Sequence, residues 1–190
     1  MTEDRDQLGQ CGKFRPDRTD LLGLSMTRPP ANSQRKSTGF VASILRRSAD
    51  AYQIHEVDGV TFTDRINTFN KLVPEWPVLQ QRHFTKGYWW LVYLNEKPVA
   101  FAGLVPFEPL PNIGYLKRCY VYPDHHGHGL QFRLMMAREL KAKQLGWTHL
   151  VSECRVNNKH SSANFIKAGF IQCEPEQPWE RDSVYWVKAI

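Results

Sequence analysis

Two glycines, Gly127 and Gly129, stand directly before a segment with helical periodicity, a placement typical of a phosphate-binding loop. The first backbone N–H groups of a helix have no partner inside the helix and lie at the positive end of its dipole, so they attract an anion. Glycine has no Cβ, which lets the backbone approach that anion closely. A tight strand-to-helix turn is the alternative interpretation. A dinucleotide-binding fingerprint needs a third glycine where Phe132 stands, and a P-loop needs Gly-Lys-Ser/Thr, so the sequence matches neither motif.

A second segment begins 29 residues after Gly129 and reads Asn158-Lys-His-Ser-Ser-Ala-Asn-Phe-Ile-Lys-Ala-Gly-Phe170. Together with His126-Gly-His-Gly-Leu-Gln131, it resembles the two signature motifs of the GCN5-related N-acetyltransferase (GNAT) superfamily. These are Arg/Gln-x-x-Gly-x-Gly/Ala between the fourth strand and the next helix, and Asn-x-x-Ala/Ser…Tyr-x-Lys-x-Gly-Phe after the fifth strand. This chain has His126, Gln131 and Phe165 where the family has Arg or Gln, a small residue and Tyr. The resemblance covers residues 50–190.

The resemblance implies the acyl-CoA N-acyltransferase fold and acetyl-CoA as co-substrate, with no metal. It predicts an enzyme, an N-acetyltransferase that moves an acetyl group to a primary amine of a small molecule, a peptide N-terminus or a lysine. In this family the backbone in the middle of the fourth strand donates to the acetyl carbonyl, which implicates the main chain of Tyr120 and Val121. The residues expected by position to bind the cofactor are Tyr120, Val121, His126, Gly127, His128, Gly129, Leu130, Gln131, Asn158, Ser161 and Phe165.

A candidate general base lies in Ser152-Glu-Cys-Arg-Val-Asn-Asn158. This segment looks like the Leu-Glu-Val-Arg-x-x-Asn of the ribosomal-protein N-terminal acetyltransferases, in which the Glu can serve as base, and the matched residue is Glu153. A carboxylate beside a partly desolvated cleft can have a raised pKa and accept a proton. The alternative is that Glu153 only pairs with Arg155 or solvent. Glu108 is the second candidate for the base.

The sequence leaves the general acid open, because the family uses the Tyr that Phe165 replaces here. We expect Tyr120, Tyr122 or another hydroxyl to substitute, or the thiolate to leave without a dedicated donor. The predicted catalytic residues are therefore Glu153 and Tyr120. Three histidines also lie in the glycine loop (His125, His126 and His128), and we expect them to act as loop donors rather than metal ligands, because a structural zinc site needs four converging ligands.

The apolar pattern predicts the elements that must position these residues. Strands are expected at 52–57, 88–94, 98–107, 115–122, 148–156, 170–173 and 182–189, and helices at 40–49, 61–73, 77–83, 130–145 and 161–168. This order predicts an α/β domain of the α+β mixed-sheet kind, with a central, mostly antiparallel twisted sheet flanked by helices. We expect the N-acetyltransferase domain over 39–190 and a basic, disordered extension over 1–38.

Charge and composition limit the partners. The formal charge is +6, and the first 48 residues hold nine Lys or Arg against five Asp or Glu, so the excess lies mainly in the segment least expected to be folded. We therefore expect no nucleic-acid partner. Two alternatives stay open: a nucleic-acid-associated protein that uses this basic segment, and a catalytically inactive acyl-CoA-binding module, which Phe165 would allow. The predicted last loop, 174–182, has four acidic residues against one Arg, which favours a cationic amine as acceptor.

No apolar run reaches the roughly 18 residues of a membrane helix, and the first six residues are too polar for a secretory signal. The four cysteines form neither a Cys-x-x-Cys pair nor a dense disulfide framework, which is typical of a reducing compartment. We therefore expect a soluble cytoplasmic protein without membrane partners, a monomer or homodimer. Cys119, Cys154 and Cys173 are expected to be buried free thiols.

Overall fold

The computed structural model describes residues 51–190 except 109, 111 and 177. The predicted helix at 40–49 and the predicted extension lie outside these residues. The strands are β1 Gln53–Val57, β2 Tyr88–Leu94, β3 Lys97–Pro106, β4 Ile113–Tyr115, β5 Cys119–Val121, β6 His149–Arg155, β7 Ile171–Cys173 and β8 Ser183–Ala189. The helices are α2 Thr63–Asn70, α3 Gln81–Thr85, the short 3-10 helix η1 Pro123–His125, α4 Leu130–Gln144 and α5 Lys159–Lys167.

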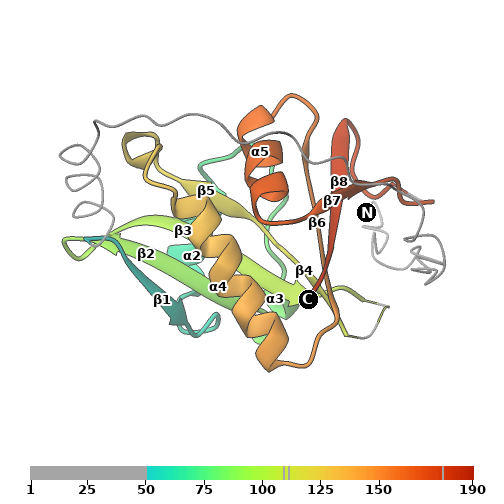
Figure 1. Cartoon of the computed structure of the whole chain (residues 1–190). Helices are drawn as coiled ribbons and strands as arrows, with labels where there is room; N and C mark the ends of the chain where they lie inside the picture. The colour runs from blue at the N-terminus through green and yellow to red at the C-terminus, as the bar shows by residue number, and fades with distance from the viewer. Residues whose placement is uncertain (1–50, 109, 111, 177) are drawn as a thin grey trace, which may run out of the picture.

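The strands form one eight-stranded sheet in the order β1-β2-β3-β4-β6-β8-β7, with β5 paired to β3 (Figure 1). Every pairing is antiparallel except β4 with β6. This confirms the predicted mixed, mostly antiparallel sheet. The parallel pair follows from connectivity, because the chain crosses from β4 to β6 through α4, and a parallel connection needs such a crossover.

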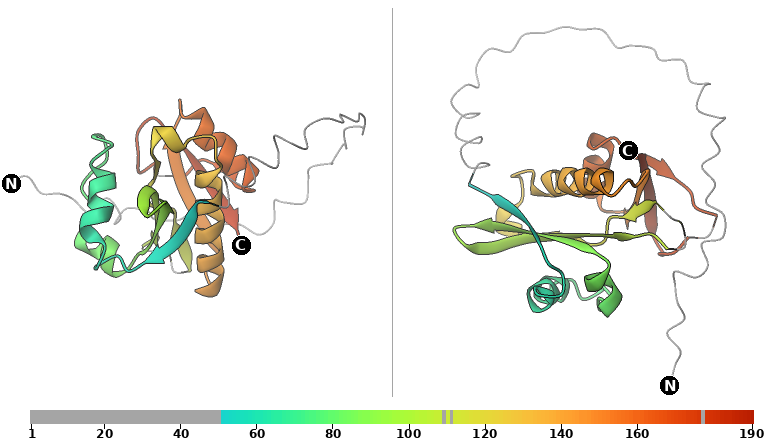
Figure 2. Two further views of the ribbon diagram at one scale, coloured as in Figure 1. Left: turned by 90° about the vertical axis from the view of Figure 1, so that its left-hand side faces the viewer. Right: turned by 90° about the horizontal axis from the view of Figure 1, so that it is seen from below.

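The helices cover both faces of the sheet, with α4 and α5 on one side and α2 and α3 on the other (Figure 2). On the α4 side the core contains Leu130, Leu134 and Met135, all at most 2% exposed. On the opposite side Ile66 and Phe69 of α2 are buried against Phe101 of β3. The first half of α4 is therefore held by apolar burial, so the position of its N-terminal end is set by the core.

The predicted strand at 115–122 is wrong in one respect, because it is divided into β4 and β5. Between them Arg118 takes a left-handed conformation, with φ 55°. Leu116 N donates to Val151 O of β6 (2.9 Å), but Lys117 O already accepts from Gly103 N of β3 (2.8 Å). The chain therefore changes partners within two residues, in the manner of a β-bulge.

This bulge opens the sheet. Strand β4 pairs with β6 only as far as Tyr115↔Val151, and β5 pairs with β3 alone. From Ser152 onward β6 is paired only on its β8 side. The result is a gap between β5 and the end of β6, which lies next to the start of α4.

The cysteine prediction holds only in part. Cys119, Cys154 and Cys173 are free, but only Cys154 is buried, and the other two are partly exposed. Within the described part of the chain, no helix is long and apolar enough to cross a bilayer.

Candidate active site

A cavity of about 150 Å³ fills the gap between β5 and β6. Its wall includes Cys119 from β5, Ser152 and Cys154 from β6, Met135 from α4 and Phe165 from α5. The cavity thus lies where the two sequence motifs meet, with α4 on one side and α5 on the other.

The register of β5 shows which backbone N–H groups face this cavity. Tyr122 N donates to Val99 O (3.0 Å), so this pair is hydrogen-bonded, and hydrogen-bonded pairs alternate along an antiparallel ladder. The Tyr120↔Phe101 pair is therefore hydrogen-bonded too, and the N–H of Tyr120 faces β3. The N–H groups of Val121 and Cys119 face the gap. Two donors can thus reach a carbonyl oxygen there: the N–H of Val121, which was predicted, and that of Cys119, which the sequence indicated only as a free thiol.

The glycine loop leaves the N-terminal end of α4 open. Gly127 and Gly129 have φ 80° and 70°, which side chains with a Cβ rarely adopt. A Cβ added at either glycine would have no atom of the described residues within 4 Å, so these residues leave the space before the helix open. The first backbone bond of the helix runs from Arg133 N to Gly129 O (3.0 Å), and the three N–H groups before Arg133 have no acceptor within the helix. This end can therefore hold a phosphate group.

The three loop histidines contact residues on β5 and just before β1. His126 Nε2 donates to Val121 O (2.9 Å), and His125 Nδ1 shares a hydrogen bond with the hydroxyl of buried Tyr52 (3.0 Å). The ring of His128 packs on Tyr52 at 5.2 Å between centroids. These contacts fix the loop against β1 and β5. Among the described residues, no cluster of three or more His, Cys, Asp or Glu could hold a metal.

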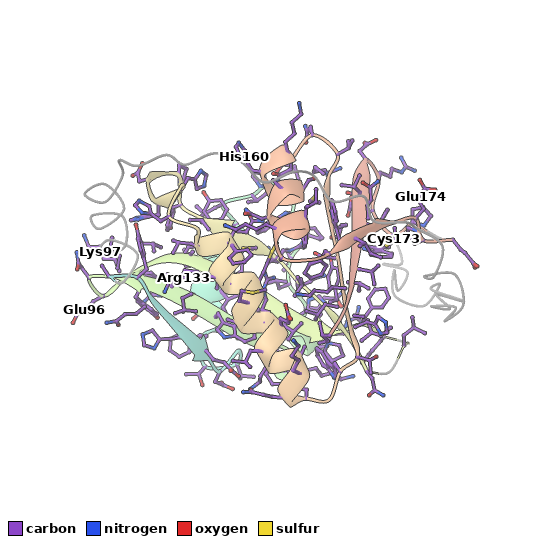
Figure 3. All side chains as sticks on the ribbon, viewed as in Figure 1. Glu96, Lys97, Arg133, His160, Cys173 and Glu174 are labelled. Atoms are coloured by element: carbon purple, nitrogen blue, oxygen red, sulfur yellow. The ribbon has the colours of Figure 1, made fainter. Side chains whose placement is uncertain are left out.

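Gln131 connects the two motifs. Its Nε2 donates to Ser161 Oγ (2.7 Å), and its Oε1 accepts from Asn164 Nδ2 (2.8 Å). Asn158 caps α5 by accepting from Ser161 N (3.0 Å). The residue that replaces a small one in the motif therefore joins α4 to α5, and it also lines the cavity. Figure 3 shows Arg133 on α4 and His160 on α5, close to the N-terminal ends of these helices.

Phe165 has a packing role in this structure. Its ring stacks on Trp186 (5.4 Å, 12° between planes) and meets the edge of Phe170 (5.2 Å). Tyr120 and Tyr122, expected as possible substitutes for the missing acid, have their rings against Phe69 of α2, and neither lines the cavity. The predicted catalytic role of Tyr120 therefore has no support from the position of its hydroxyl.

Glu153 lines a second cavity. This cavity has a volume of about 720 Å³ and extends between α3, the end of β3 and Trp179. Glu153 lines both cavities, so it stands where they meet. A volume of this size is within the range of about 300–1,000 Å³ that small-molecule sites have.

Two donors hold the Glu153 carboxylate. Tyr115 Oη donates to Oε1 (2.5 Å) and Trp179 Nε1 donates to Oε2 (2.9 Å). Burial raises the pKa of Glu153, while these hydrogen bonds and the charges of Lys117 and Arg118 act in the opposite direction. Glu153 does not pair with Arg155, whose Nη2 lies 4.0 Å from Glu180. A carboxylate with a raised pKa and lone pairs left over on both oxygens can accept a proton.

Glu108 is less suited to be the base. It is half exposed and forms an ion pair with Lys86 at 2.9 Å. The hydrogen bond and charge of Lys86 lower the pKa of Glu108, so it holds a proton less readily than an ordinary carboxylate.

The family model of the GNAT acetyltransferases matches residues 52–170. The chain belongs to the GNAT acetyltransferase family. Solved structures with the same fold include the ribosomal-protein-S18-alanine N-acetyltransferase of Escherichia coli (18% identity, TM-score 0.58, covering 73% of this chain and 94% of that chain). A Bacillus subtilis acetyltransferase in complex with CoA has 14% identity and a TM-score of 0.59, and the match covers 73% of this chain and 99% of that chain. A Streptococcus agalactiae acetyltransferase has 21% identity and a TM-score of 0.56, and the match covers 74% of this chain and 99% of that chain. No curated protein matches significantly in sequence.

This GNAT protein has a buried arginine behind the bulge. Arg138 of α4 is 1% exposed, and its Nη1 donates to Gly103 O and Arg118 O, both at 3.3 Å. Its Nε donates to Leu134 O (3.0 Å). The bulge leaves the Gly103 and Arg118 carbonyls without a regular ladder partner, and Arg138 supplies one. Helical periodicity alone does not reveal this role, because the acceptors are main-chain atoms far away in sequence.

Replacing Arg138 with Met is expected to lower the free energy of unfolding by about 2 kcal/mol. Two buried carbonyls would lose their donor, which costs about 1–3 kcal/mol each. Part of this loss is offset, because the variant no longer has to bury the charged guanidinium group. Urea denaturation of both proteins measures the difference. Unchanged stability would show that the two carbonyls do not depend on Arg138.

Proposed function

We propose that the protein is an acetyl-CoA-dependent N-acetyltransferase with Glu153 as general base. The observation that carries the proposal is the position of Glu153 on the wall shared by the two cavities. The thioester end of the donor fits the smaller cavity, beside the N–H groups of Cys119 and Val121, while its pyrophosphate lies outside this cavity at Gly127–Gly129. The acceptor fits the larger cavity, with its amine toward Glu153.

In the proposed reaction Glu153 takes a proton from the acceptor's ammonium group, directly or through one water. The neutral nitrogen attacks the thioester carbon and forms the C–N bond. The N–H groups of Val121 and Cys119 stabilise the negative oxygen that develops. The C–S bond then breaks, and the thiolate leaves with the electron pair. The nitrogen loses its second proton as the amide forms, and the thiolate takes up a proton, so that the products are the amide and free thiol. Among the described residues that line the larger cavity, Tyr115 carries the only hydroxyl, which donates to Glu153. Burial and Glu153 raise the pKa of Tyr115, so it stays protonated.

We propose that the acceptor binds with its amine protonated, as a cation. Of the acidic loop at 174–182, Trp179 and Glu180 line the larger cavity. Glu180 and Glu153 together can attract an ammonium group. Arg82, Lys86, Lys117 and Arg118 line the same cavity, however, so its wall is not acidic overall.

The test is release of free thiol from acetyl-CoA with a panel of primary amines and peptides, alongside calorimetric binding of CoA. We expect CoA to bind and thiol to appear only when an acceptor is present. CoA binding without acceptor-dependent thiol release would favour the alternative of an inactive acyl-CoA-binding module, which the loss of the tyrosine hydroxyl at Phe165 suggests. Absence of CoA binding would contradict the proposed donor site.

A further inference from the structure

The larger cavity contains a cation, Lys117, that has no anionic partner among the described residues. No carboxylate of these residues lies within 4.0 Å of Lys117 Nζ, whereas Lys86, Lys141, Lys143 and Lys188 each form such a pair. The ammonium group of Lys117 lies 5.2 Å from the centre of the Tyr115 ring. Burial, followed by the charge of Arg118, lowers the pKa of Lys117 to about 8. A desolvated charge is costly unless it is paired, so this position favours an anionic ligand.

Two other cations of this cavity, Arg118 and Lys86, are already engaged. Arg118 donates to Asn70 Oδ1 (3.2 Å) and Pro77 O (3.1 Å), and its guanidinium lies 4.9 Å from the Trp76 ring. These contacts make Arg118 part of a fixed wall between β5 and the α2–α3 connection. Lys86 is neutralised by Glu108 at the exposed end of the cavity.

Tyr115 places Lys117 and Glu153 relative to each other. Its hydroxyl donates to Glu153, and its ring lies beneath Lys117, so a proton acceptor and a positive charge contact the same side chain. A ligand with an amine and an acidic group a few bonds apart can meet both at once.

We propose that the acceptor is a small zwitterion, an amine that carries a carboxylate close by, as amino acids do; this inference rests on the proposed function. Its amine faces Glu153 and its carboxylate binds Lys117. The volume of about 720 Å³ holds such a molecule with room for a side chain. The ion pair forms in a largely desolvated place, where it is stronger than on the surface.

The test compares acceptors with the same carbon skeleton: leucine, leucinamide and isopentylamine. Because the acidic group also changes the pKa of the amine, kcat/KM is expressed per neutral amine for each compound. We expect leucine to exceed both neutral compounds in kcat/KM at pH 7 by about tenfold or more, the size of one charge-assisted contact. O-phosphoethanolamine against ethanolamine shows whether a phosphate serves as well as a carboxylate. Equal or higher kcat/KM for leucinamide would overturn the inference while leaving the proposed enzyme intact.

Variants assign the preference to Lys117. Lys117→Met is expected to bring the ratio of leucine to leucinamide close to one. Lys117→Arg, which keeps the charge, should retain part of the ratio. Lys71→Met removes one exposed lysine at the end of α2, outside both cavities, and should not change it. A preference for leucine that survives in Lys117→Met would contradict the assignment.

The pH dependence gives an independent readout. The charged groups that act on Lys117 are Arg118 on its own segment, Glu153 on β6, Arg82 on α3 and Glu180 before β8. His83 also faces it, with a pKa lowered to about 4, so it is neutral from pH 6 upward. The preference for leucine should therefore fall as pH rises through about 8 in the wild type, but persist to pH 9.5 in Lys117→Arg.

Calorimetric binding of leucine and leucinamide in the presence of CoA separates this inference from the proposed function. If no acceptor is acetylated but leucine binds more tightly than leucinamide and loses this advantage in Lys117→Met, the anion site stands and the proposed enzyme fails. Equal binding of both compounds contradicts the anion site, whatever the activity.

Discussion

The Glu153→Gln protein is expected to transfer acetyl groups about 10²–10⁴-fold less efficiently than the wild type in kcat/KM, because it loses the base that accepts the amine's proton. The substitution keeps the size of the side chain. The introduced amide is not expected to disturb the fold, since its oxygen can accept from Trp179 while its nitrogen donates to the Tyr115 hydroxyl, which can reverse its role. Binding of CoA should therefore stay within about twofold of the wild type.

The measurement is initial-rate thiol release over a range of acceptor concentrations, with CoA binding followed by calorimetry. Glu174→Gln is the matched control, because it removes one exposed carboxylate beside β7 that lines neither cavity (Figure 3). A Glu153→Gln protein with wild-type kcat/KM would exclude Glu153 as base. A loss of CoA binding in this variant would indicate a structural role instead.

The pH profile tests the same assignment. Glu153 accepts a proton only when ionised, and burial raises its pKa above the ordinary 4.5, so kcat/KM should rise with pH through this raised pKa. The hydrogen bond from Tyr115 lowers the pKa of Glu153, so Tyr115→Phe should move this rise to higher pH. Glu153→Gln should abolish it. A rise that is unchanged in Glu153→Gln would belong to another group, such as the acceptor amine.

Gly129→Ala is expected to weaken CoA binding by about ten- to a hundredfold, the loss of one hydrogen bond to a charged phosphate. Gly129 has φ 70° directly before α4, and a Cβ there would lie more than 4 Å from every atom of the part of the chain that the structure describes. In the free protein the methyl group therefore costs only the left-handed conformation, about 1 kcal/mol of stability. In the complex it occupies the place where the phosphate approaches the helix N–H groups.

The opposite end of the same helix provides the control. Gly146 follows α4, has φ 72°, and a Cβ added to it would also have no atom within 4 Å. Gly146→Ala should lose stability as Gly129→Ala does, as measured by urea denaturation, but bind CoA like the wild type. S-acetylpantetheine lacks the pyrophosphate, so its binding should not distinguish the two variants. Equal CoA affinity in both would place the pyrophosphate elsewhere.

The sequence by itself determined the elements whose signals are local. The predicted strand at 88–94 has the bounds of β2, and the predicted helix at 130–145 ends one residue after α4. The alternation of apolar residues in a strand and their spacing in a helix reflect which face of the element is buried, and this pattern repeats along the element. The left-handed glycines at Gly127 and Gly129 are local as well, since the turn into α4 requires them. Family and fold class followed from these patterns and the two motifs.

Only the tertiary structure decided how the strand at 115–122 divides. Its aromatic and β-branched residues predict one continuous strand. The break arises because adjacent residues of this segment form their backbone hydrogen bonds with different strands, some with β3 and some with β6. The same break frees the carbonyls that Arg138 binds and opens the gap that contains the smaller cavity. A pattern of side chains along one strand carries no information about which backbone partners lie on either side.

The surroundings of Glu153 were also beyond the sequence. Tyr115 and Trp179 lie 38 and 26 residues away from it in the chain, and their hydrogen bonds to the carboxylate depend on β4, β6 and the loop before β8 packing together. A motif could identify Glu153 as a candidate because its own strand carries the signal. The raised pKa of Glu153, the lowered pKa of Lys117 and the cavity that both residues line come from burial, which only the assembled fold produces.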